Sequence, residues 1–434
     1  MSKTAQCKIY PELLAMAIKR RRDFHHYAET AWTEFRTASI VATELTRLGY
    51  EVQVGDEVIQ ETAMMGVPSE QELTVHMQRA IDQGADPIWV EKFRGGKTGV
   101  VGTLKFDRKG PTVALRFDMD ANDLIETSDS KHRPLIEGFA SVNSGAMHAC
   151  GHDGHTAVGL AVAQLIAANK TELIGCFKII FQPAEEGVCG AKAMVGKGVV
   201  DDVNYFLGMH FGIRAAKTGM LVCQTTGFLA TTKIDAVFTG VPAHAGAAPE
   251  TGRNALLAAA TATVQLHGIS RHSGGASRIN VGFLQGGLGR NIIPADAIIK
   301  LETRGFTTEI NDYMQTEAQR IINAAAVMQD VTVTMTEMGS ASGCGRSDEL
   351  AKRVEKVAEQ LGIFDTILPE AELGASEDAA YFMDRVQSNG GQASYMIVGS
   401  NLVAGHHDNH FDLDEQAIGK AISLLNQIVL DILT

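Results

Sequence analysis

The run from Met147 to Thr156 is rich in side chains that could bind a metal, since it holds three histidines, one cysteine and one aspartate. Thiolate, imidazole and carboxylate groups are the ligands that transition metals take in proteins. A helix N-terminus with polar caps would need only Asp153 and Thr156. It would not explain why Cys150 stands so close to His152. The run therefore predicts a metal site.

Further acidic and imidazole groups stand just past short apolar runs that we interpret as strands. They are Asp118 and Asp120 after 112–117, Glu185 and Glu186 after 178–181, His210 after 205–209, and His406 and His407 after 394–398. Ligands of an open parallel sheet bind beyond the carboxyl ends of its strands. We therefore expect these groups to meet there, although each one alone is also typical of a cap, a solvated surface pair or a satisfied core residue.

The combined inventory predicts a site for two divalent ions, because thiol, imidazole and carboxylate ligands are all present and one glutamate is left over. Two metals can hold a hydroxide and polarise a carbonyl together. A free carboxylate beside that water can act as the general base. Cysteine and histidine tolerate zinc, whereas carboxylate-rich sites also accept manganese, so both metals stay open.

Strands alternate with helices over most of the chain. We expect helices within 11–48, 70–83, 156–169 and 414–433, and strands at 51–54, 99–106, 112–117, 178–181, 205–209 and 394–398. Such alternation is typical of an α/β domain with a three-layer, mostly parallel sheet. The connection between Val54 and Gly99 is long and holds Trp89, Val90 and Phe93, so we expect a packed lid or interface element there.

The middle of the chain has a different order of elements. It reads strand 231–239, helix 254–266, strands 278–284 and 297–303, helix 310–328 and strand 331–336. This β-α-β-β-α-β order is typical of a ferredoxin-like α+β unit. We therefore predict an inserted domain at 227–338, within a metal-binding catalytic domain made of 1–226 and 339–434.

Composition excludes several classes of protein. Of the 434 residues, 45% are hydrophobic and 21% charged, which is ordinary globular usage, and the net charge of −13 argues against a nucleic-acid partner. The apolar stretch 156–169 is too short to cross a bilayer, and no secretory signal is visible at the start. Six scattered cysteines do not form a disulfide framework. We expect a soluble cytoplasmic protein with reduced thiols and no membrane partner.

Seven motifs together resemble one family. They are HACGHDGHT, QPAEEG, GMHFG, GVPAHAGAAPETGRNAL, GGLGRNIIPADA, SEDAAYF and GHHDNHFDLDE. In this order they resemble the dinuclear metallo-amidohydrolases that include hippurate, N-acyl amino acid and auxin-conjugate hydrolases. The segment before Gly99 departs from typical members, and with it the chain looks most like the branch that acts on p-aminobenzoyl-glutamate.

The resemblance implies roles for residues of the large α/β domain. The metal ligands would be Cys150, His152, Glu186, His210 and His407. Glu185 would be the general base. His407 is preferred to His406 because it stands four residues before Phe411, as in the family pattern. Asp118 and Asp120 occupy places where other branches carry a metal histidine and its orienting aspartate, so they would only support the ligands.

The resemblance also implies that the inserted domain is a lid and dimerisation domain. His244 would reach into the partner subunit's site and help to hold the oxyanion, and Asn291 would contact substrate. Arg304 is a candidate for a substrate carboxylate because a guanidinium matches it bidentately, although a buried structural ion pair explains it equally well. Arg290 is a weaker candidate of the same kind.

The expected reaction is hydrolysis of the amide bond of a small N-acyl amino acid, with p-aminobenzoyl-glutamate giving p-aminobenzoate and glutamate as the preferred case. A general aminoacylase or hippurate-type hydrolase is an alternative. A metal-bound subunit without catalysis is another, although the extra glutamate argues against it. The expected assembly is a homodimer or a hetero-oligomer with a related second subunit.

Overall fold

The computed structural model describes residues 11–434, so Cys7 and the start of the chain lie outside the described residues. The chain divides into two compact units. The large unit is formed by the chain up to Thr226 together with Gly345–Leu373 and Asp378–Thr434, and the small unit by Gly227–Cys344 and Gly374–Glu377. The sequence pattern placed the end of the insertion at 338, whereas its last strand, β10 (Thr332–Ala341), continues past that point.

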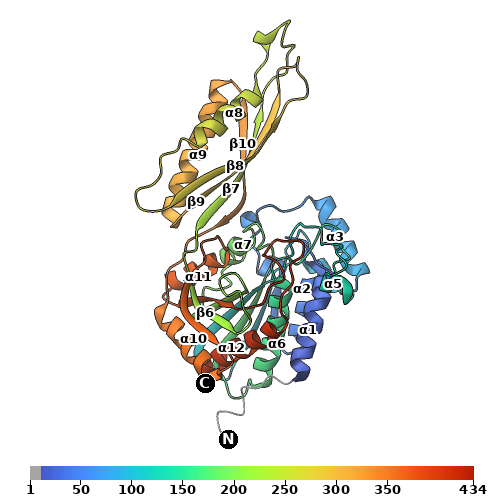
Figure 1. The fold of residues 1–434 in the computed structure, drawn as a ribbon, viewed down its shortest axis with the longest axis vertical. Helices are drawn as coiled ribbons and strands as arrows, with labels where there is room; N and C mark the ends of the chain where they lie inside the picture. The colour runs from blue at the N-terminus through green and yellow to red at the C-terminus, as the bar shows by residue number, and fades with distance from the viewer. Residues whose placement is uncertain (1–10) are drawn as a thin grey trace. The chain divides into compact units, whose positions relative to one another are not determined.

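The large unit contains an eight-stranded sheet in the order β1-β2-β4-β3-β5-β12-β6-β11 (Figure 1). Its strands are β1 (Glu51–Val54), β2 (Val100–Lys105), β3 (Arg108–Asp118), β4 (Ile174–Gln182), β5 (Tyr205–Phe211), β6 (Met220–Thr226), β11 (Thr366–Glu372) and β12 (Gln392–Val398). The central strands β4, β3, β5 and β12 are parallel. Antiparallel pairs lie toward the edges, at β1–β2, β2–β4 and β12–β6. The expected α/β fold with a mostly parallel sheet is confirmed.

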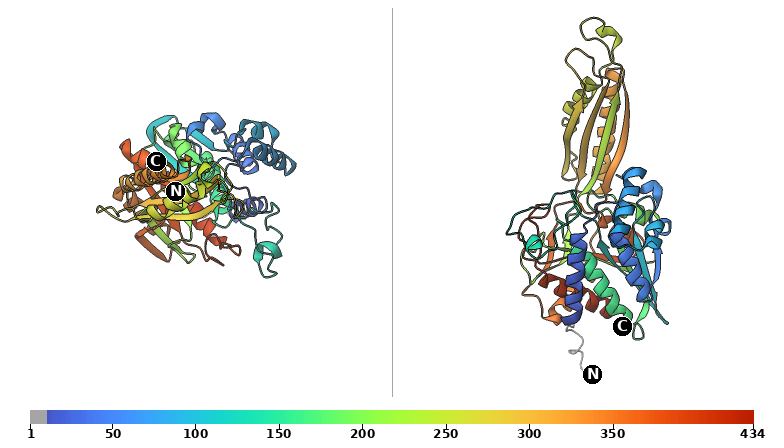
Figure 2. Two further views of the ribbon diagram at one scale, coloured as in Figure 1. Left: turned by 90° about the horizontal axis from the view of Figure 1, so that it is seen from above. Right: turned by 90° about the vertical axis from the view of Figure 1, so that its right-hand side faces the viewer.

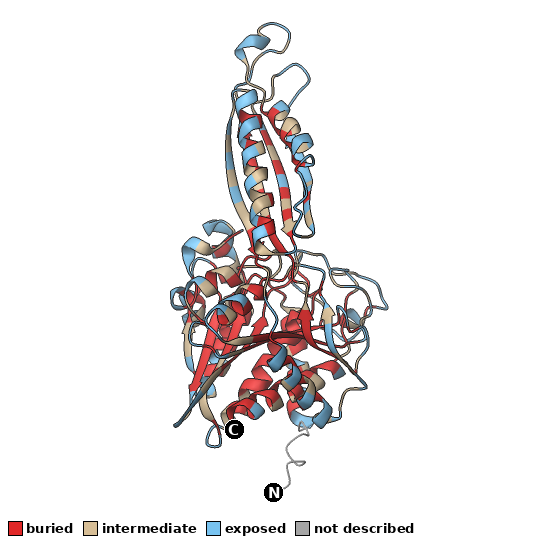
Figure 3. Ribbon diagram, turned by 90° about the vertical axis from the view of Figure 1, so that its left-hand side faces the viewer, coloured by how far each residue is buried: buried red, intermediate tan, exposed pale blue. Residues whose placement is uncertain are grey.

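Helices cover both faces of this sheet, because side chains alternate between the faces along each strand. Phe117 of β3 lies against α6 (His152–Ala168), on the same side as α12 (Gln416–Leu433). Phe206 of β5 points to the other side, where its ring stacks on Phe382 of α11 (Ala379–Ser388) at a centroid distance of 5.6 Å. Figure 3 shows the buried residues concentrated in the sheet and in the helices against it.

The helix that follows the Met147–Thr156 run begins at His152, earlier than the expected start at 156. Gly151 precedes it with a φ of +91°, a conformation that residues with a Cβ rarely adopt. Farther along α6, a Cβ on Gly159 would lie 2.7 Å from Phe117 and 2.8 Å from Phe181. The helix therefore packs closely on the sheet, and its first turn is held next to the ends of β3 and β4.

α1 (Pro11–His26) lies beside α6 (Figure 2), and α2 (Phe35–Arg47) precedes β1. The long connection after β1 is ordered: it contains α3 (Glu70–Asp82) and α4 (Pro87–Lys92), which both contact α2. Val90 and Phe93 are fully buried there. The sequence did not indicate β6, β11, α7 (Ala191–Gly196), α10 (Asp348–Leu361) or α11.

Within residues 11–434, α12 is the one helix long and apolar enough to cross a membrane, and it is longer than the apolar stretch noted at 156–169. More than half of it, 56%, is buried inside the protein. It contacts α6, α10 and the strands β3, β4 and β12. The core helix of a globular domain has the same length and composition, and α12 is packed as such a helix.

The small unit is a four-stranded antiparallel sheet in the order β10-β7-β9-β8. It consists of β7 (Ala230–Thr239), α8 (Ala255–Leu266), β8 (Ser277–Gly286), β9 (Asp296–Gly305), α9 (Thr308–Met328) and β10. This is the expected β-α-β-β-α-β order. Both helices pack on one face of the sheet (Figure 1). The other face carries polar and charged side chains such as Lys233, Glu302 and Arg304.

Candidate metal centre

The structure brings together six predicted site residues of the large unit. They are Cys150 before α6, His152 at its first position, Glu185 and Glu186 after β4, His210 in β5 and His407 after β12. Most of them lie past a strand end, as expected, but His210 lies inside β5. The parallel pairing explains the convergence, because Asp118 of β3 and Gln182 of β4 are register partners at the same edge of the sheet.

The possible ligand atoms are close to one another. Cys150 Sγ lies 3.3 Å from His210 Nε2, and His407 Nε2 lies 3.4 Å from Glu186 Oε2. His152 Nε2 lies 3.8 Å from Glu185 Oε2 and 3.9 Å from Glu186 Oε1. The atoms form overlapping groups of three within 4.8 Å of one another, and Cys150, His152 and Glu186 each belong to two of these groups.

Two imidazoles are oriented by hydrogen bonds to main-chain carbonyls. His152 Nδ1 donates to the carbonyl of Asp120 at 2.9 Å, and His210 Nδ1 donates to the carbonyl of Phe211 at 2.7 Å. A proton on Nδ1 leaves the lone pair on Nε2, which faces the cluster in both cases. This is the arrangement that prepares a histidine to bind a metal.

The cluster fits a cation, because two of its buried polar atoms have no hydrogen-bond partner among the described residues: His152 Nε2 and Glu186 Oε1. Leaving such groups unpaired is costly, and a cation between them would satisfy both. Burial acts to lower the pKa of His152, but Asp118, Asp120 and Glu186 outweigh it and raise that pKa to about 10. The surroundings therefore favour positive charge, and the thiol, imidazole and carboxylate donors suit zinc or manganese.

The thiol of Cys150 depends on such a cation to ionise. Burial raises its pKa well above the usual range, and the carboxylates of Glu186, Glu185 and Asp118 raise it further. A metal bound at Sγ would replace the thiol proton, since the thiolate is the form that coordinates metals. Metal binding is thus expected to release a proton from Cys150.

The loop that carries the two glutamates is held in an unusual conformation. Ala184 has a φ of +53° and Val188 a φ of +61°, both rare for residues with a Cβ. Asp120 accepts hydrogen bonds from the main-chain N–H groups of Glu185 at 3.0 Å and Glu186 at 2.8 Å. The surroundings therefore impose the backbone conformation that presents the glutamates, as is frequent at functional sites.

Asp118 supports the cluster through a neighbouring histidine. Its carboxylate lies 2.6 Å from His155 Nδ1 and 2.7 Å from Arg116 Nη1. Burial alone would raise the pKa of Asp118, but His152, His155 and Arg116 hold it well below its usual range. Because His155 Nε2 accepts from the N–H of Phe211 at 3.1 Å, both ring nitrogens of His155 are already used.

The two consecutive histidines after β12 differ in their surroundings. His406 Nε2 is 3.0 Å from the carbonyl of Phe211, and burial lowers the pKa of His406 to about 4. His407 has a φ of +64°, and its N–H donates to the carbonyl of Ala149 at 2.8 Å. This backbone geometry directs the His407 ring to Glu186, so the geometry favours His407 over His406 as a ligand.

Two buried carboxylates that the sequence did not single out also hold the glutamate loop. Glu34 accepts a hydrogen bond from the N–H of Ala184 at 2.8 Å. Asp378 accepts from the N–H groups of Gly190 at 3.1 Å and Ala191 at 2.9 Å. Asp378 belongs to the motif SEDAAYF, which gave it no role. Nothing in the local sequence distinguishes Glu34 from an acidic residue at a helix start.

The other predicted site residues belong to the small unit. His244 and Asn291 lie in neighbouring loops, since Ala245 N–H donates to the carbonyl of Asn291 at 2.9 Å. His244 Nδ1 accepts from the N–H groups of Gly246 and Ala247, both at 3.1 Å. The proton of a neutral His244 ring must therefore be on Nε2. His244 is exposed, so this N–H is available to a ligand.

The two arginine candidates differ. Arg304 is partly buried, and its Nε and Nη2 both lie 3.2 Å from the carboxylate of Glu302. This contact is an ion pair within the sheet. Arg290 is exposed and has no hydrogen-bond or ion-pair partner within residues 11–434.

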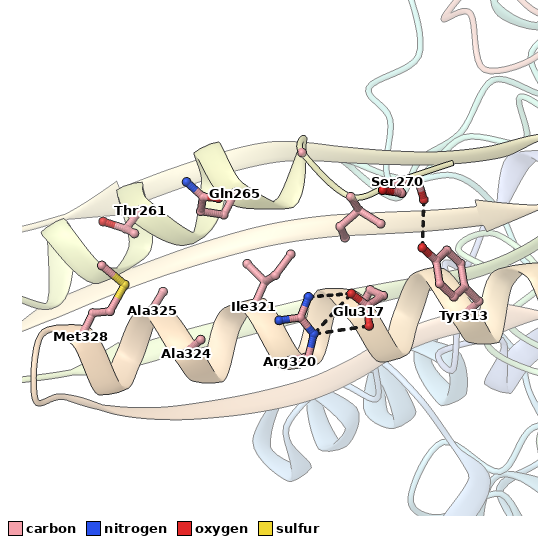
Figure 4. Close-up of a pocket in the computed structure, with 12 residues that line it drawn as sticks. Thr261, Gln265, Ser270, Tyr313, Glu317, Arg320, Ile321, Ala324, Ala325 and Met328 are labelled. Carbon is pink, nitrogen blue, oxygen red and sulfur yellow. Dashed lines mark hydrogen bonds and ion pairs between the residues drawn. The ribbon is translucent and has the colours of Figure 1, made fainter. Parts of the chain in front are cut away.

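The small unit also has a hollow of about 390 Å³ between α8 and α9, shown in Figure 4. Tyr313 donates to the carbonyl of Ser270 at one end, and Arg320 pairs with Glu317 at the rim. None of the predicted site residues lines it. We assign no chemistry to this hollow.

A buried ionic cluster connects α1 with the start of α6. His25 Nδ1 lies 2.8 Å from Asp153, and its Nε2 lies 3.0 Å from Glu126. Arg21 contacts Asp153 at 2.7 Å and Asp412 at 2.9 Å. Since both ring nitrogens of His25 face carboxylates, the ring is best satisfied as an imidazolium.

This cluster predicts a pH dependence of stability. Burial acts to lower the pKa of His25, but the hydrogen bonds to Asp153 and Glu126 outweigh it and raise the pKa above 6.5. The stabilisation is fully present below about pH 6.5, the unfolded value, and is lost as pH rises through the folded pKa. We expect the unfolding free energy of metal-free protein to fall over that range, and His25→Gln to remove this component. Denaturant titrations from pH 6 to 9 measure it; an unchanged pH slope in the variant would contradict it.

Comparison with known proteins places these residues in context. The description Peptidase family M20/M25/M40 matches residues 114–431. The chain is 50% identical to one of the subunits of p-aminobenzoyl-glutamate hydrolase from Escherichia coli K12, covering 95% of this chain and 94% of that protein. It is 49% identical to the indole-3-acetyl-aspartic acid hydrolase of Enterobacter agglomerans, covering 95% of each.

A solved structure is similar over almost the whole chain. The aminobenzoyl-glutamate utilization protein from Klebsiella pneumoniae superposes with a TM-score of 0.85 at 41% identity, covering 97% of this chain and 96% of that one. The similarity therefore extends over both units and not only over the motifs.

Proposed function

The chain belongs to the peptidase family M20/M25/M40 and is a hydrolase of amide bonds in N-acyl amino acids, and from this premise we propose that its substrate is p-aminobenzoyl-glutamate. The observation that carries the proposed site is the cluster of Cys150, His152, Glu186, His210 and His407 with Glu185 at its side. These five residues would hold two divalent ions, zinc or manganese, and Glu185 remains for proton transfer.

The proposed mechanism uses Glu185 twice. Bound metals would supply Lewis-acid chemistry, polarising the amide carbonyl and making a water more acidic. The Glu185 carboxylate accepts the proton of the water that attacks the carbonyl carbon. It then gives this proton to the amide nitrogen as the C–N bond breaks, releasing a carboxylic acid and an amino acid. Asp120, which holds the Glu185 main chain, keeps the carboxylate in reach.

His244 is proposed to stabilise the carbonyl oxygen as it gains negative charge, through its Nε2–H. The register places Arg304 opposite Thr231 at one end of β7, and Asp296 opposite Thr239 at the end near His244. At about 3.4 Å per residue, the two ends are roughly 27 Å apart. An N-acyl amino acid is only as long as about three extended residues, roughly 11 Å. One substrate therefore cannot contact both, so we propose that His244 serves the site of a second subunit.

The assembly is proposed to be a homodimer or a hetero-oligomer with a related second subunit. The relative from Escherichia coli is named as one of several subunits of its hydrolase, which supports the second possibility. Asn291 lies beside His244 and is proposed to contact substrate with it. We also propose a cytoplasmic location, supported by the buried position of α12 and the free thiols of Cys150, Cys176, Cys189, Cys223 and Cys344.

The test of the function is a comparison of substrates. Purified protein, loaded with zinc or manganese, is assayed on p-aminobenzoyl-glutamate, indole-3-acetyl-aspartate, hippurate and N-acetyl-methionine. We expect the highest kcat/KM with p-aminobenzoyl-glutamate. A preference for indole-3-acetyl-aspartate is the second candidate, because the chain is almost as similar to that hydrolase. Equal use of hippurate would indicate a general aminoacylase, and no turnover despite bound metal would indicate a non-catalytic subunit.

Arg304→Ala tests which partner Arg304 serves. If Arg304 binds a substrate carboxylate, the variant should raise KM for an N-aroyl glutamate about tenfold more than for its methyl ester, because a charge-assisted hydrogen bond is lost. If Arg304 only pairs with Glu302, both substrates should lose equally, or the protein should unfold more readily. Steady-state kinetics and a thermal melt measure the two results. Arg290→Ala, without a partner to lose, should have the smaller effect on KM.

A further inference from the structure

The sheet of the small unit places two arginines directly opposite each other. Arg278 of β8 is the register partner of Arg304 of β9. Opposite residues of an antiparallel pair project from the same face, with Cβ atoms about 5 Å apart, and like charges there destabilise the sheet. An arrangement that lowers stability locally is frequent where a site serves a ligand.

The charges around this pair do not cancel. Glu302 neutralises Arg304, at 3.2 Å. The guanidinium of Arg278 has no hydrogen-bond or ion-pair partner in the part of the chain that the structure describes, and Arg278 is exposed. Lys233 stands opposite Glu302 in the register of β7 and β9. Glu302 therefore keeps a cationic neighbour when Arg304 turns to another anion.

The two guanidiniums line one hollow. Its volume is about 220 Å³, and its lining residues are Arg278, Ile279, Asn280, Glu302 and Arg304. The side chains give it an excess of positive charge in a chain whose net charge is −13. A local cationic site in an acidic protein concentrates anions that the rest of the surface repels.

We propose that Arg278 and Arg304 form a two-guanidinium site for a dicarboxylate, and that it receives both carboxylates of the glutamyl or aspartyl part of the substrate. This inference rests on the proposed function. A guanidinium matches a carboxylate bidentately, so two of them match a dicarboxylic amino acid better than a neutral one. Two relatives are named for conjugates of glutamate and aspartate, which share this chemistry. Arg278 is then the residue that separates dicarboxylic from neutral amino acids.

Equilibrium binding tests the site without turnover. Metal-free protein is titrated calorimetrically with glutarate, a dicarboxylate, and with butyrate, which lacks the second carboxylate. We expect wild type to bind glutarate at least tenfold more tightly than butyrate, and Arg278→Gln to remove that difference. Lys300→Gln is the matched control, because Lys300 lies on the same face of β9, loses the same charge and pairs with Asp235 outside the hollow. It should bind glutarate as wild type does.

Kinetics give the second test. Arg278→Gln should raise KM for p-aminobenzoyl-glutamate about tenfold, leave kcat nearly unchanged, and barely alter KM for p-aminobenzoyl-glutamine. Arg278→Lys should restore part of the loss. Equal effects on both substrates, equal effects of Arg278→Gln and Lys300→Gln, or glutarate binding that is unchanged in Arg278→Gln would each overturn the proposal.

The two proposals fail separately. If wild type does not cleave p-aminobenzoyl-glutamate but glutarate still binds through Arg278, the proposed substrate is wrong and the dicarboxylate site stands. If wild type cleaves p-aminobenzoyl-glutamate and Arg278→Gln binds glutarate like wild type, the proposed function stands and the two-guanidinium site does not.

Discussion

Glu185→Gln is expected to lose almost all turnover while the protein keeps its metals. The amide cannot accept a proton from the attacking water, yet it has the size of the carboxylate and leaves the five ligands in place. General acid–base groups contribute about 10²–10⁴-fold, and Glu185 serves in both directions, so the loss should lie toward the upper end. The measurements are kcat on p-aminobenzoyl-glutamate and the metal content of the purified variant by mass spectrometry.

Glu186→Gln is the informative comparison, since the two residues are neighbours in one loop and are held by the same aspartate, Asp120. Glu186→Gln removes a proposed ligand and should lower metal content as well as activity. Near-normal activity of Glu185→Gln with full metal occupancy would remove Glu185 from the role of base. Loss of metal in both variants would instead make Glu185 a ligand.

Cys150→Ser is expected to lower metal affinity strongly. A neutral hydroxyl is a much weaker ligand than a thiolate, and its loss also deprives the site of one negative charge. Even supporting groups outside the coordination sphere typically change affinity 10- to 100-fold, so the loss here should be at least about 100-fold. Chelator competition measures the affinity. The wild type should also release a proton on binding metal, because burial and Glu186 keep the Cys150 thiol protonated without it.

Cys223→Ser is the matched control for this result. Cys223 is fully buried in β6, and burial raises its pKa to about 12, but it takes no part in the candidate metal groups. The control should lower thermal stability without changing metal affinity. Tight metal binding by Cys150→Ser would mean that Cys150 is only a core residue beside His210.

Much of the candidate site follows from the sequence, because its residues are concentrated in short local motifs. Cys150 and His152 are separated only by Gly151, whose positive φ is a local property of glycine. Glu185 follows a strand that its β-branched, apolar pattern already predicts, and parallel strands end at one edge. The choice of His407 over His406 came from its spacing to Phe411, and its contact with Glu186 agrees with it.

The tertiary structure decided the features that depend on long-range pairing. The positions of β6 and β11 at one side of the sheet are such a case, since strand order depends on contacts between segments far apart in the chain. Glu34 holds the N–H of Ala184 from 150 residues away, and no local pattern marks it.

Arg278 shows the same division most clearly. By itself, Arg278 is an exposed polar residue in an expected strand, and the sequence shows only that the strand is there. A shift of one residue in register would turn it to the other face. The pairing of β8 with β9 sets it opposite Arg304. The sequence by itself determined which chemistry the chain carries, because ligand types and spacings are local. Only the tertiary structure decided which charges meet, because that depends on register and on the packing of distant segments.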